Sequence, residues 1–460
     1  MPNSQNKPVE KKSLLETLDT SVDGEVAEIG HVLEQGQKKA TDGVKKVTHI
    51  IGPGVITGFS DDDPSGIGTY AISGAQYGLG QGWLTLFQLP FMIAVQEMCA
   101  RIGIVTGKGL AGNIKHHFSV KWLYGLVLLL VVANVFNIGA DISAMGASLA
   151  MIAGGSSALW AIVTTLFIII LEIFISYKVY ANLLKWLTVF FLAYVVTAFI
   201  IPQDWGQIVR SLVVPHMEYS KLFLITAVGF LGTTISPYLF FWQASEEVEE
   251  QVSSGKRKEI GDNVRFNHPK EIKKMRWDTV VGMVLSQLVA FFIVVTTAST
   301  LHNNGITQIT SAQDAAQALV PLAGQFAGLV FAIGIIGAGL MGIPVLAGSG
   351  AYVLSEVFGW RQGLFHKFKE AIGFYSVIIV STLVGLGINF AGIDPIQGLL
   401  YAAVVNGVVA VPLIAFILLI SNKKEIMGTK KNTIWSNVFG WGTFGLMALA
   451  VIMMFWSMAG

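Results

Sequence analysis

Long apolar stretches alternate with short polar segments from about residue 50 to the C-terminus. A helix of about 20 apolar residues crosses the hydrocarbon core of a bilayer, and most of these stretches reach that length. The pattern therefore predicts an all-α, polytopic membrane protein with eleven spans. We place these spans at about 50–80, 82–105, 122–152, 157–177, 181–202, 221–250, 278–301, 325–358, 371–390, 394–420 and 434–458.

Two of the predicted spans are interrupted by polar residues and proline. The first span breaks at about 60–66, in Ser-Asp-Asp-Asp-Pro-Ser-Gly, and the sixth breaks at about 232–237. Pro64 and Pro237 have no backbone N–H, so carbonyl groups upstream of them lose their helical partners. Unwound backbone at membrane depth is tolerated where it lines a cavity, and secondary transporters build ion sites in this way. The breaks therefore predict a pathway for a cation.

The distribution of basic residues predicts how the spans are oriented. Of the 30 Lys and Arg residues, only Arg210 and Lys221 fall in loops that follow odd-numbered spans. Cytoplasmic loops are enriched in Lys and Arg, so we expect a multi-pass protein of the plasma membrane with a cytoplasmic N-terminus and an extracellular C-terminus. The polar residues 1–48 would form a cytoplasmic tail, either an amphipathic helix or a disordered segment, ahead of a transmembrane domain at 49–458.

In this orientation the two broken spans run antiparallel and lie five spans apart. That spacing is typical of inverted five-helix repeats. The first repeat would comprise spans 1–5 (about 50–202) and the second spans 6–10 (about 221–420), with span 11 (about 434–458) appended.

Composition narrows the function. The chain is 53% hydrophobic and 13% charged, with a mean hydropathy of +0.63, values that exclude an ordinary soluble domain. Its single cysteine, Cys99, excludes an internal disulfide and a cysteine-cluster metal site. The sequence has no nucleotide-binding loop, catalytic triad or zinc signature. We expect no enzyme, prosthetic group, nucleic-acid partner or required protein partner; divalent metal ions and the lipid bilayer are the expected partners.

The breaks supply the candidate metal ligands. Carboxylates are hard oxygen ligands that suit Mg²⁺, Mn²⁺ or Ca²⁺. Asp63, directly before Pro64, is the strongest candidate, because a buried charge at membrane depth needs a cation or water. Asp61 and Asp62 are either further ligands or residues that cap a half-helix or face water. The other candidate ligands in the two breaks are Ser60, Gly66, Thr233 and Ser236.

Other polar residues within the spans are candidates for the pathway or for packing. Tyr238, Asp141 and Gln243 are candidate pathway or coupling residues, although Asp141 would also suit contact with a neighbouring helix. Asn134, Asn137 and Asn406 are expected to hydrogen-bond between helices, and Glu97 and Arg101 to pair at helical spacing. The glutamates Glu246, Glu247, Glu249 and Glu250 form either a solvated face or an acidic funnel for departing cations.

Several motifs resemble the Nramp family of divalent-metal transporters. They are Gly52-Pro-Gly with Asp63-Pro64, Gly74 to Gly78, Ile104 to Gly107, Ala140 to Ala144, and Gly232 to Tyr238, the last of which is similar to the family's methionine-proline-histidine motif. The resemblance covers about residues 48–458. It implies a leucine-transporter-like fold, with broken helices 1 and 6, that carries divalent cations.

Departures from the family pattern modify this expectation. The family's ligand asparagine falls on Gly66, its metal-binding methionine on Ser236, its proton-linked histidine on Tyr238 and its span-3 glutamate on Ala144. A site without sulfur suits harder cations, and Mg²⁺ usually keeps several waters. The chain thus resembles the Nramp-related magnesium transporters, which implies Mg²⁺ and Mn²⁺ uptake with weak or no proton coupling. A proton-coupled Mn²⁺/Fe²⁺ symporter, or a sodium-coupled organic-solute symporter on the same fold, are the alternatives.

Overall fold

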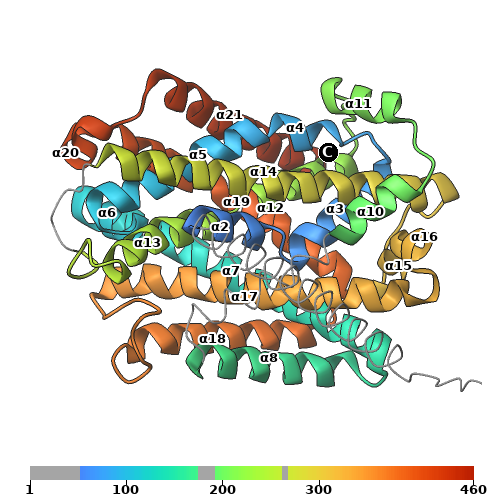
Figure 1. Ribbon diagram of the computed structural model, residues 1–460, viewed down its shortest axis with the longest axis horizontal. Coiled ribbons are helices and arrows are strands. Elements are labelled where there is room, and N and C mark those ends of the chain that lie inside the picture. Colours follow the sequence, from blue (N-terminus) through green and yellow to red (C-terminus); the bar gives the residue numbers. More distant parts are fainter. Residues whose placement is uncertain (1–51, 175–191, 262–267, 460) are drawn as a thin grey trace, which may run out of the picture. The chain divides into compact units, whose positions relative to one another are not determined.

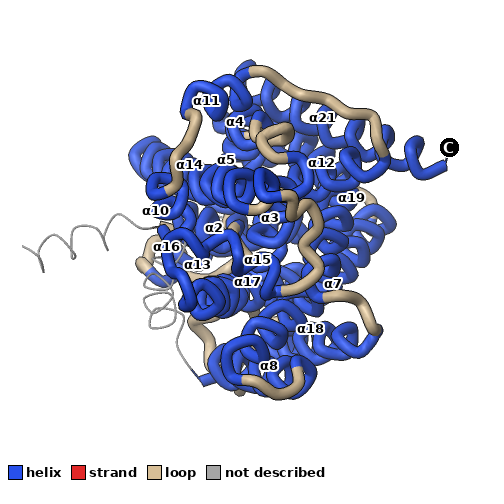
Figure 2. The backbone as a smooth tube through the Cα atoms, turned by 90° about the vertical axis from the view of Figure 1, so that its right-hand side faces the viewer, coloured by secondary structure: helices blue, strands red, loops and turns tan. Residues whose placement is uncertain are grey.

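The computed structural model describes residues 52–174, 192–261 and 268–459. The expected tail at 1–48 and the first half of the expected fifth span lie outside the described residues. Throughout the described ranges the regular structure is helical, as predicted, and the loops lie mainly between helix ends (Figure 2).

Both predicted helix breaks are present. The first span is divided into α2 (Pro53–Asp61) and α3 (Pro64–Tyr77), and the sixth into α12 (Lys221–Thr234) and α13 (Pro237–Ser253). Each second half begins with a proline, whose fixed φ suits the first turn of a helix and whose missing N–H would have no partner there.

The remaining helices follow the predicted spans closely. They are α4 (Trp83–Phe87) with α5 (Leu89–Thr106), α7 (Val120–Ala153), α8 (Ser157–Phe174), α10 (Leu192–Ile200), α14 (Pro269–Thr300), α17 (Ala327–Phe358), α18 (Ile372–Ile388), α19 (Pro395–Asn422) and α21 (Ile434–Ala459). Nine helices among the described residues are long and apolar enough to cross a membrane. The broken sixth span is among these nine, as Lys221–Ser253, and the broken first span is not.

Short helices connect the spans. They are α6 (Leu110–His117), α11 (Trp205–Val213), α15 (Ala312–Ala316), α16 (Val320–Ala323) and α20 (Lys424–Met427). The segment of α11 lies between two predicted spans, where the hydrophobic pattern predicts no helix. Asp204 starts this helix, since its side chain accepts a hydrogen bond from the Gln207 N–H at 3.0 Å.

The broken first span lies between two long helices. Figure 1 shows α2 and α3 between α14 and α17, and both halves contact both of these helices. The packing of α2 on α14 is close because glycines face each other. A Cβ on Gly58 would lie 2.3 Å from the backbone of Gly282, and one on Gly282 would lie 2.2 Å from the Gly54 carbonyl oxygen. Small residues allow helix backbones to approach in this way in membranes.

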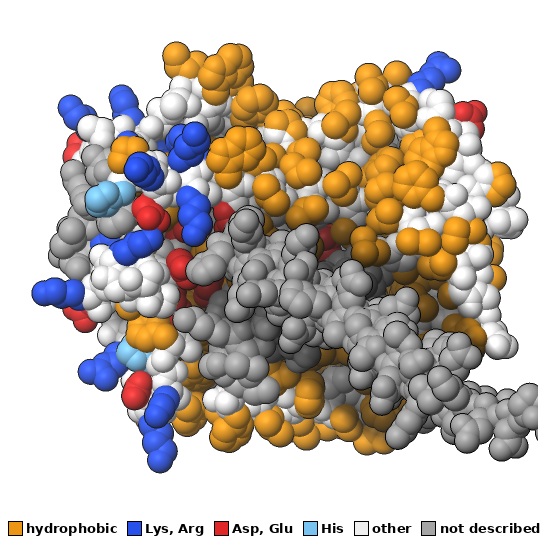
Figure 3. All heavy atoms as spheres, in the orientation of Figure 1, with side chains coloured by type: hydrophobic (Ala, Val, Ile, Leu, Met, Phe, Trp, Pro, Cys, Tyr) orange, Lys and Arg blue, Asp and Glu red, His pale blue; other side chains and the backbone are white. Residues whose placement is uncertain are grey.

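The surface separates apolar from basic regions. Figure 3 shows hydrophobic side chains across the upper and right-hand part of the face it draws, whereas most of the Lys and Arg side chains gather at the left-hand end. In the shared orientation of Figure 1, α6 and α20 lie at that end. Large apolar side chains such as Trp122 and Phe174 are exposed, at 62% and 78%. An apolar belt of this kind is what a lipid-facing surface requires.

Candidate functional site

Asp63 lies at the gap between α2 and α3 and caps α3. Its backbone is extended (φ −68°, ψ 173°). Its Oδ1 accepts hydrogen bonds from the Gly66 N–H (2.8 Å) and the Ser65 hydroxyl (2.6 Å). The sequence dictates this geometry, because aspartate is a preferred N-cap and Pro64 fits the first helical position.

The second oxygen of Asp63 faces α7 and α13. Oδ2 accepts hydrogen bonds from the Asn137 side-chain amide at 3.1 Å and from the Tyr238 hydroxyl at 3.2 Å. The Tyr238 hydroxyl also lies 3.0 Å from the Ser60 carbonyl oxygen, so it links the two breaks. Asp63 is 1% exposed, and the ion pairs found among the described residues do not include it. Its negative charge therefore meets only neutral donors.

Asp61 and Asp62 face a different helix, α14. The Ser286 hydroxyl donates to Asp61 Oδ2 at 2.7 Å and lies 3.4 Å from Asp62 Oδ1. Both aspartates are fully buried, yet Asp61 Oδ1 and Asp62 Oδ2 accept no hydrogen bond from any described residue. A buried oxygen without a donor is costly unless water or a cation reaches it. The three consecutive aspartates thus present acceptors on two sides of the break.

The second break contributes hydroxyl groups. Thr233 Oγ1 lies 3.4 Å from Ser65 Oγ, which brings the last turn of α12 to the first turn of α3. The Ser236 hydroxyl instead points back along α12, within 2.9 Å of the Gly232 carbonyl oxygen and 2.5 Å of that of Thr233. Ser236 is buried at the N-cap of α13, but its side chain makes no capping hydrogen bond to that helix.

Gly66 lies where the two breaks meet. A Cβ at this position would lie 3.0 Å from the Asp61 carbonyl oxygen, 3.4 Å from Thr233 Oγ1 and 3.5 Å from the ring of Tyr70. A side chain here would therefore project among oxygen atoms of both breaks. Because glycine has no side chain, the nearest polar atoms at this position are the Asp61 carbonyl oxygen and the Thr233 hydroxyl.

Asp141 is connected to Asp63 through Asn137. The amide nitrogen of Asn137 lies 3.1 Å from an oxygen of each aspartate, and its carbonyl oxygen accepts a hydrogen bond from Asn406 at 2.9 Å. Asp141 is fully buried, and its Oδ1 accepts no hydrogen bond from a described residue. Of the predicted interhelical asparagines, Asn137 and Asn406 are thus part of the network around the break, whereas Asn134 donates to Leu346 and Ser349 of α17.

Gln243 is not at the break. It lies on α13 about two turns after Pro237, where its amide nitrogen donates to the Thr279 hydroxyl of α14 at 2.8 Å. The predicted pair of Glu97 and Arg101 is present at 2.9 Å, and Arg276 adds a second contact to Glu97 at 2.8 Å.

The described residues do not place three or more His, Cys, Asp or Glu side chains around one point. A cation at the break would therefore have few carboxylate ligands and would depend on hydroxyl, carbonyl and water oxygens. Such a donor set suits a hard cation as cargo and gives no position to a sulfur ligand.

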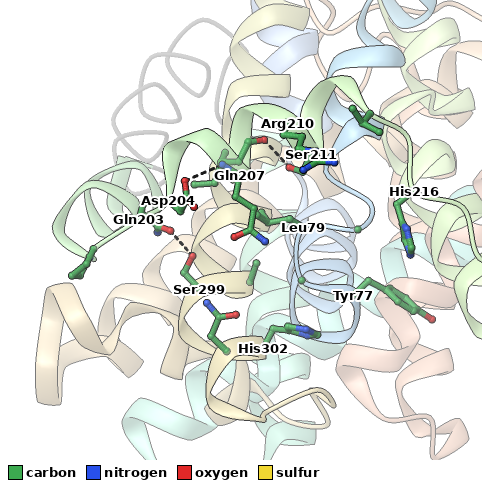
Figure 4. A pocket seen from close by; sticks show the side chains of 17 residues that line it. Tyr77, Leu79, Gln203, Asp204, Gln207, Arg210, Ser211, His216, Ser299 and His302 are labelled. Carbon is green, nitrogen blue, oxygen red and sulfur yellow. Dashed lines mark hydrogen bonds between the residues drawn. The ribbon is translucent and has the colours of Figure 1, made fainter.

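A separate cavity of about 660 Å³ lies beyond the end of α3 (Figure 4). Side chains that line it include Tyr77, Gln207, Arg210, His216 and His302, and none of its lining residues belongs to either break. The cavity is therefore distinct from the candidate cation site.

Sequence reasoning identified the aspartates but missed two of their partners as site residues. Asn137 lies four residues before Asp141, on the same helix face. This spacing in the sequence could have predicted that the two side chains are in contact. Ser286 contacts Asp61 across more than 200 residues of sequence, and no local pattern marks it.

Comparisons with known proteins agree on one family. The family model "Natural resistance-associated macrophage protein-like" (Nramp) matches residues 54–457. The divalent metal cation transporter MntH of Klebsiella pneumoniae is 26% identical over 440 residues, covering 93% of this chain and 97% of that protein. The same transporter of a second strain of that species is also 26% identical over 440 residues.

Solved structures show the same fold. A crystal structure of the Eremococcus coleocola manganese transporter, in complex with an aromatic bis-isothiourea substituted compound, has a TM-score of 0.70 at 17% identity, covering 88% of this chain and 84% of that one. MhsT in complex with L-phenylalanine has a TM-score of 0.54 at 12% identity, covering 87% and 98%. At these identities the likeness concerns the fold alone.

Proposed function

We propose that this chain, a divalent-metal transporter that belongs to the Nramp family, takes up Mg²⁺ and Mn²⁺ with weak or no coupling to protons. The observation that carries the proposal is the position of Asp63. Its carboxylate is buried at a helix break at membrane depth and receives hydrogen bonds from neutral groups only. A buried charge in a membrane protein of this kind marks an ion pathway.

The choice of cation follows from the donor atoms. Around the break these are carboxylate, hydroxyl, amide and carbonyl oxygens, contributed by Asp63, Thr233 and their neighbours. Ser236 and Gly66 stand where the family has a thioether and an amide, so the affinity that sulfur gives to softer metals is absent. Mg²⁺ and Mn²⁺ prefer oxygen, and Mg²⁺ usually retains several of its waters.

The proposed absence of strong proton coupling rests on Tyr238 and Asp141. The phenol of Tyr238 occupies the position of the family's histidine, and as a neutral donor it hydrogen-bonds Asp63 and the Ser60 carbonyl. Asp141 is then the titratable group of α7 that remains available for protons. Its Oδ1, like one oxygen each of Asp61 and Asp62, accepts no hydrogen bond from a described residue, which favours the alternative, a proton-coupled Mn²⁺/Fe²⁺ symporter.

The orientation is also part of the proposal. The basic end in Figure 3 would face the cytoplasm of a cell whose plasma membrane surrounds the apolar belt. The broken spans support an inverted arrangement, because α13 runs antiparallel to α2. Tyr238, near the start of α13, contacts Ser60 near the end of α2.

Uptake of Mn²⁺ into proteoliposomes tests the proposal, together with calorimetric Mn²⁺ binding to the full chain. We expect Asp63→Ala to weaken binding at the break at least about 100-fold, which corresponds to about 2.8 kcal/mol. Glu250→Ala, which removes an exposed carboxylate of α13, serves as the control and should bind normally. In the wild type, Mg²⁺ should compete with Mn²⁺. Near wild-type binding by a folded Asp63→Ala variant would place the site elsewhere.

A further inference from the structure

We propose that Glu247 and Asp278, with Gln243 and Thr279, form a second cation-binding station between the break and the predicted cytoplasmic end. This proposal rests on the proposed transport of divalent cations. Two of the residues come from α13 and two from α14, and the station would hold a hydrated divalent cation after it leaves Asp63.

The position of the station follows from helix geometry. Gln243 and Glu247 lie 6 and 10 residues after Pro237, about 9 and 15 Å along α13 at about 1.5 Å per residue. On α14, Asp278 lies 8 residues before Ser286, about 12 Å along that helix. Since Ser286 contacts Asp61 and Tyr238 contacts Asp63, the two helices reach the same depth on the same side of the break.

The side chains meet across a gap between helices. α13 and α14 pack against α2 and α5 rather than closely against each other. The amide nitrogen of Gln243 reaches the Thr279 hydroxyl at 2.8 Å. Glu247 is one turn further along the same face of α13, and Asp278 directly precedes Thr279 on α14. The Gln243–Thr279 contact therefore joins the two helices at a point where each also carries a carboxylate.

Unpartnered oxygens indicate that this cluster receives a ligand. Gln243 is fully buried and Glu247 is 4% exposed. Gln243 Oε1 and Glu247 Oε1 accept no hydrogen bond from the described residues. The ion pairs of the described residues do not include Glu247. A buried carboxylate or amide oxygen without a donor is costly unless water or a cation reaches it.

Asp278 also connects the station to the first span. Its Oδ2 accepts a hydrogen bond from the Gly54 N–H at 2.7 Å, in the first turn of α2. A cation at the station would thus touch the same carboxylate that holds α2 against α14. Ion pathways use successive sites of moderate affinity, because an ion must leave each site as readily as it enters.

The test is a calorimetric titration of the full chain with MnCl₂ alone. We expect wild type to bind two Mn²⁺ ions, the weaker at the station. Asp63→Ala should lose the tighter ion and keep the weaker, whereas Glu247→Gln should do the reverse and lower the uptake rate about tenfold without changing KM. Asp278→Asn is the second variant, since its amide oxygen still accepts the Gly54 N–H.

The neighbouring glutamate provides a matched control. Glu246 also lies on α13, but the Tyr352 hydroxyl of α17 contacts it at 3.2 Å, so Glu246→Gln should keep both ions. One bound Mn²⁺ in wild type, unaffected by Glu247→Gln and Asp278→Asn, would overturn the station and leave the Asp63 site standing. Failure of wild type to bind any Mn²⁺ would overturn the proposed function as well.

Discussion

The close packing of α2 on α14 gives a prediction about the moving parts of the transporter. In Gly58→Ala the new Cβ would lie 2.3 Å from the Gly282 carbonyl carbon and oxygen. Ordinary carbon contacts begin at about 3.5 Å, so the two helices must separate by roughly 1 Å. Both obstructing atoms belong to the backbone, and no side-chain rotation relieves the clash.

The magnitude follows from two opposing effects. Overpacking of this kind costs about 1–3 kcal/mol, while replacing glycine by alanine within a helix recovers about 0.5–1 kcal/mol. A net cost of about 1 kcal/mol would fall only on the state in which α2 lies against α14. Alternating access requires one bundle to move against the other, so Gly58→Ala should shift the equilibrium about fivefold toward a separated α2.

Maleimide labelling of a cysteine at the interface measures this shift. Val55 is 4% exposed, and its Cα would lie 2.9 Å from a Cβ built on Gly282. Val55→Cys should therefore label slowly in the parent and about fivefold faster with Gly58→Ala. Gly334→Ala on α17 is the control, because a Cβ there meets nothing within 4 Å. Equal labelling rates for a folded Gly58→Ala protein and the parent would refute the reasoning.

Two further predictions concern the ion. Ser236→Met should increase Cd²⁺ binding relative to Mg²⁺ at least tenfold by calorimetry, because it supplies a thioether at the break; an unchanged ratio would show that residue 236 does not face the ion. In liposomes with an internal pH dye, a Mn²⁺ gradient should leave the lumen close to its starting pH, because Tyr238 replaces the titrating histidine. Metal-driven acidification that disappears in Asp141→Asn would instead establish a symporter.

Most of the fold is encoded locally and was therefore predictable. The lengths of the apolar stretches define the spans, and Pro64 and Pro237 mark where two of them restart. The helix α11 was missed because its nine residues are too few and too amphipathic to register as a span, although Asp204 provides a cap signal. Local patterns determine helices well when the pattern is long or ends at a proline.

The site was only partly predictable, because its contacts depend on how helices rotate against each other. Asp63 could be assigned from its neighbours in sequence alone. That Asp61 and Asp62 face Ser286 on α14, while Asp63 faces Asn137 on α7, follows from the crossing of three helices. Gln243 was a candidate pathway residue, and its contact with Thr279 on α14, two turns beyond the break, could not be read from the sequence.

The hydrogen bonds around Asp63 bear on whether the ion binds dehydrated. A carboxylate offers about four lone-pair sites, and four donors from Ser65, Gly66, Asn137 and Tyr238 already reach Asp63. A bare cation would have to displace at least one of them, and a hydrogen bond to a charged group contributes about 1.5–3 kcal/mol.

Whereas Asp63 has a full set of donors, three neighbouring carboxylate oxygens have none within the described part of the chain. Asp61 Oδ1, Asp62 Oδ2 and Asp141 Oδ1 are buried acceptors to which no described residue donates. The waters of a hydrated ion are donors, so they would satisfy these oxygens while the ion retains part of its shell. A fully dehydrated ion would leave most of them unsatisfied. The distribution of donors and acceptors therefore supports the proposal of a cation that gives up its water reluctantly, as Mg²⁺ does.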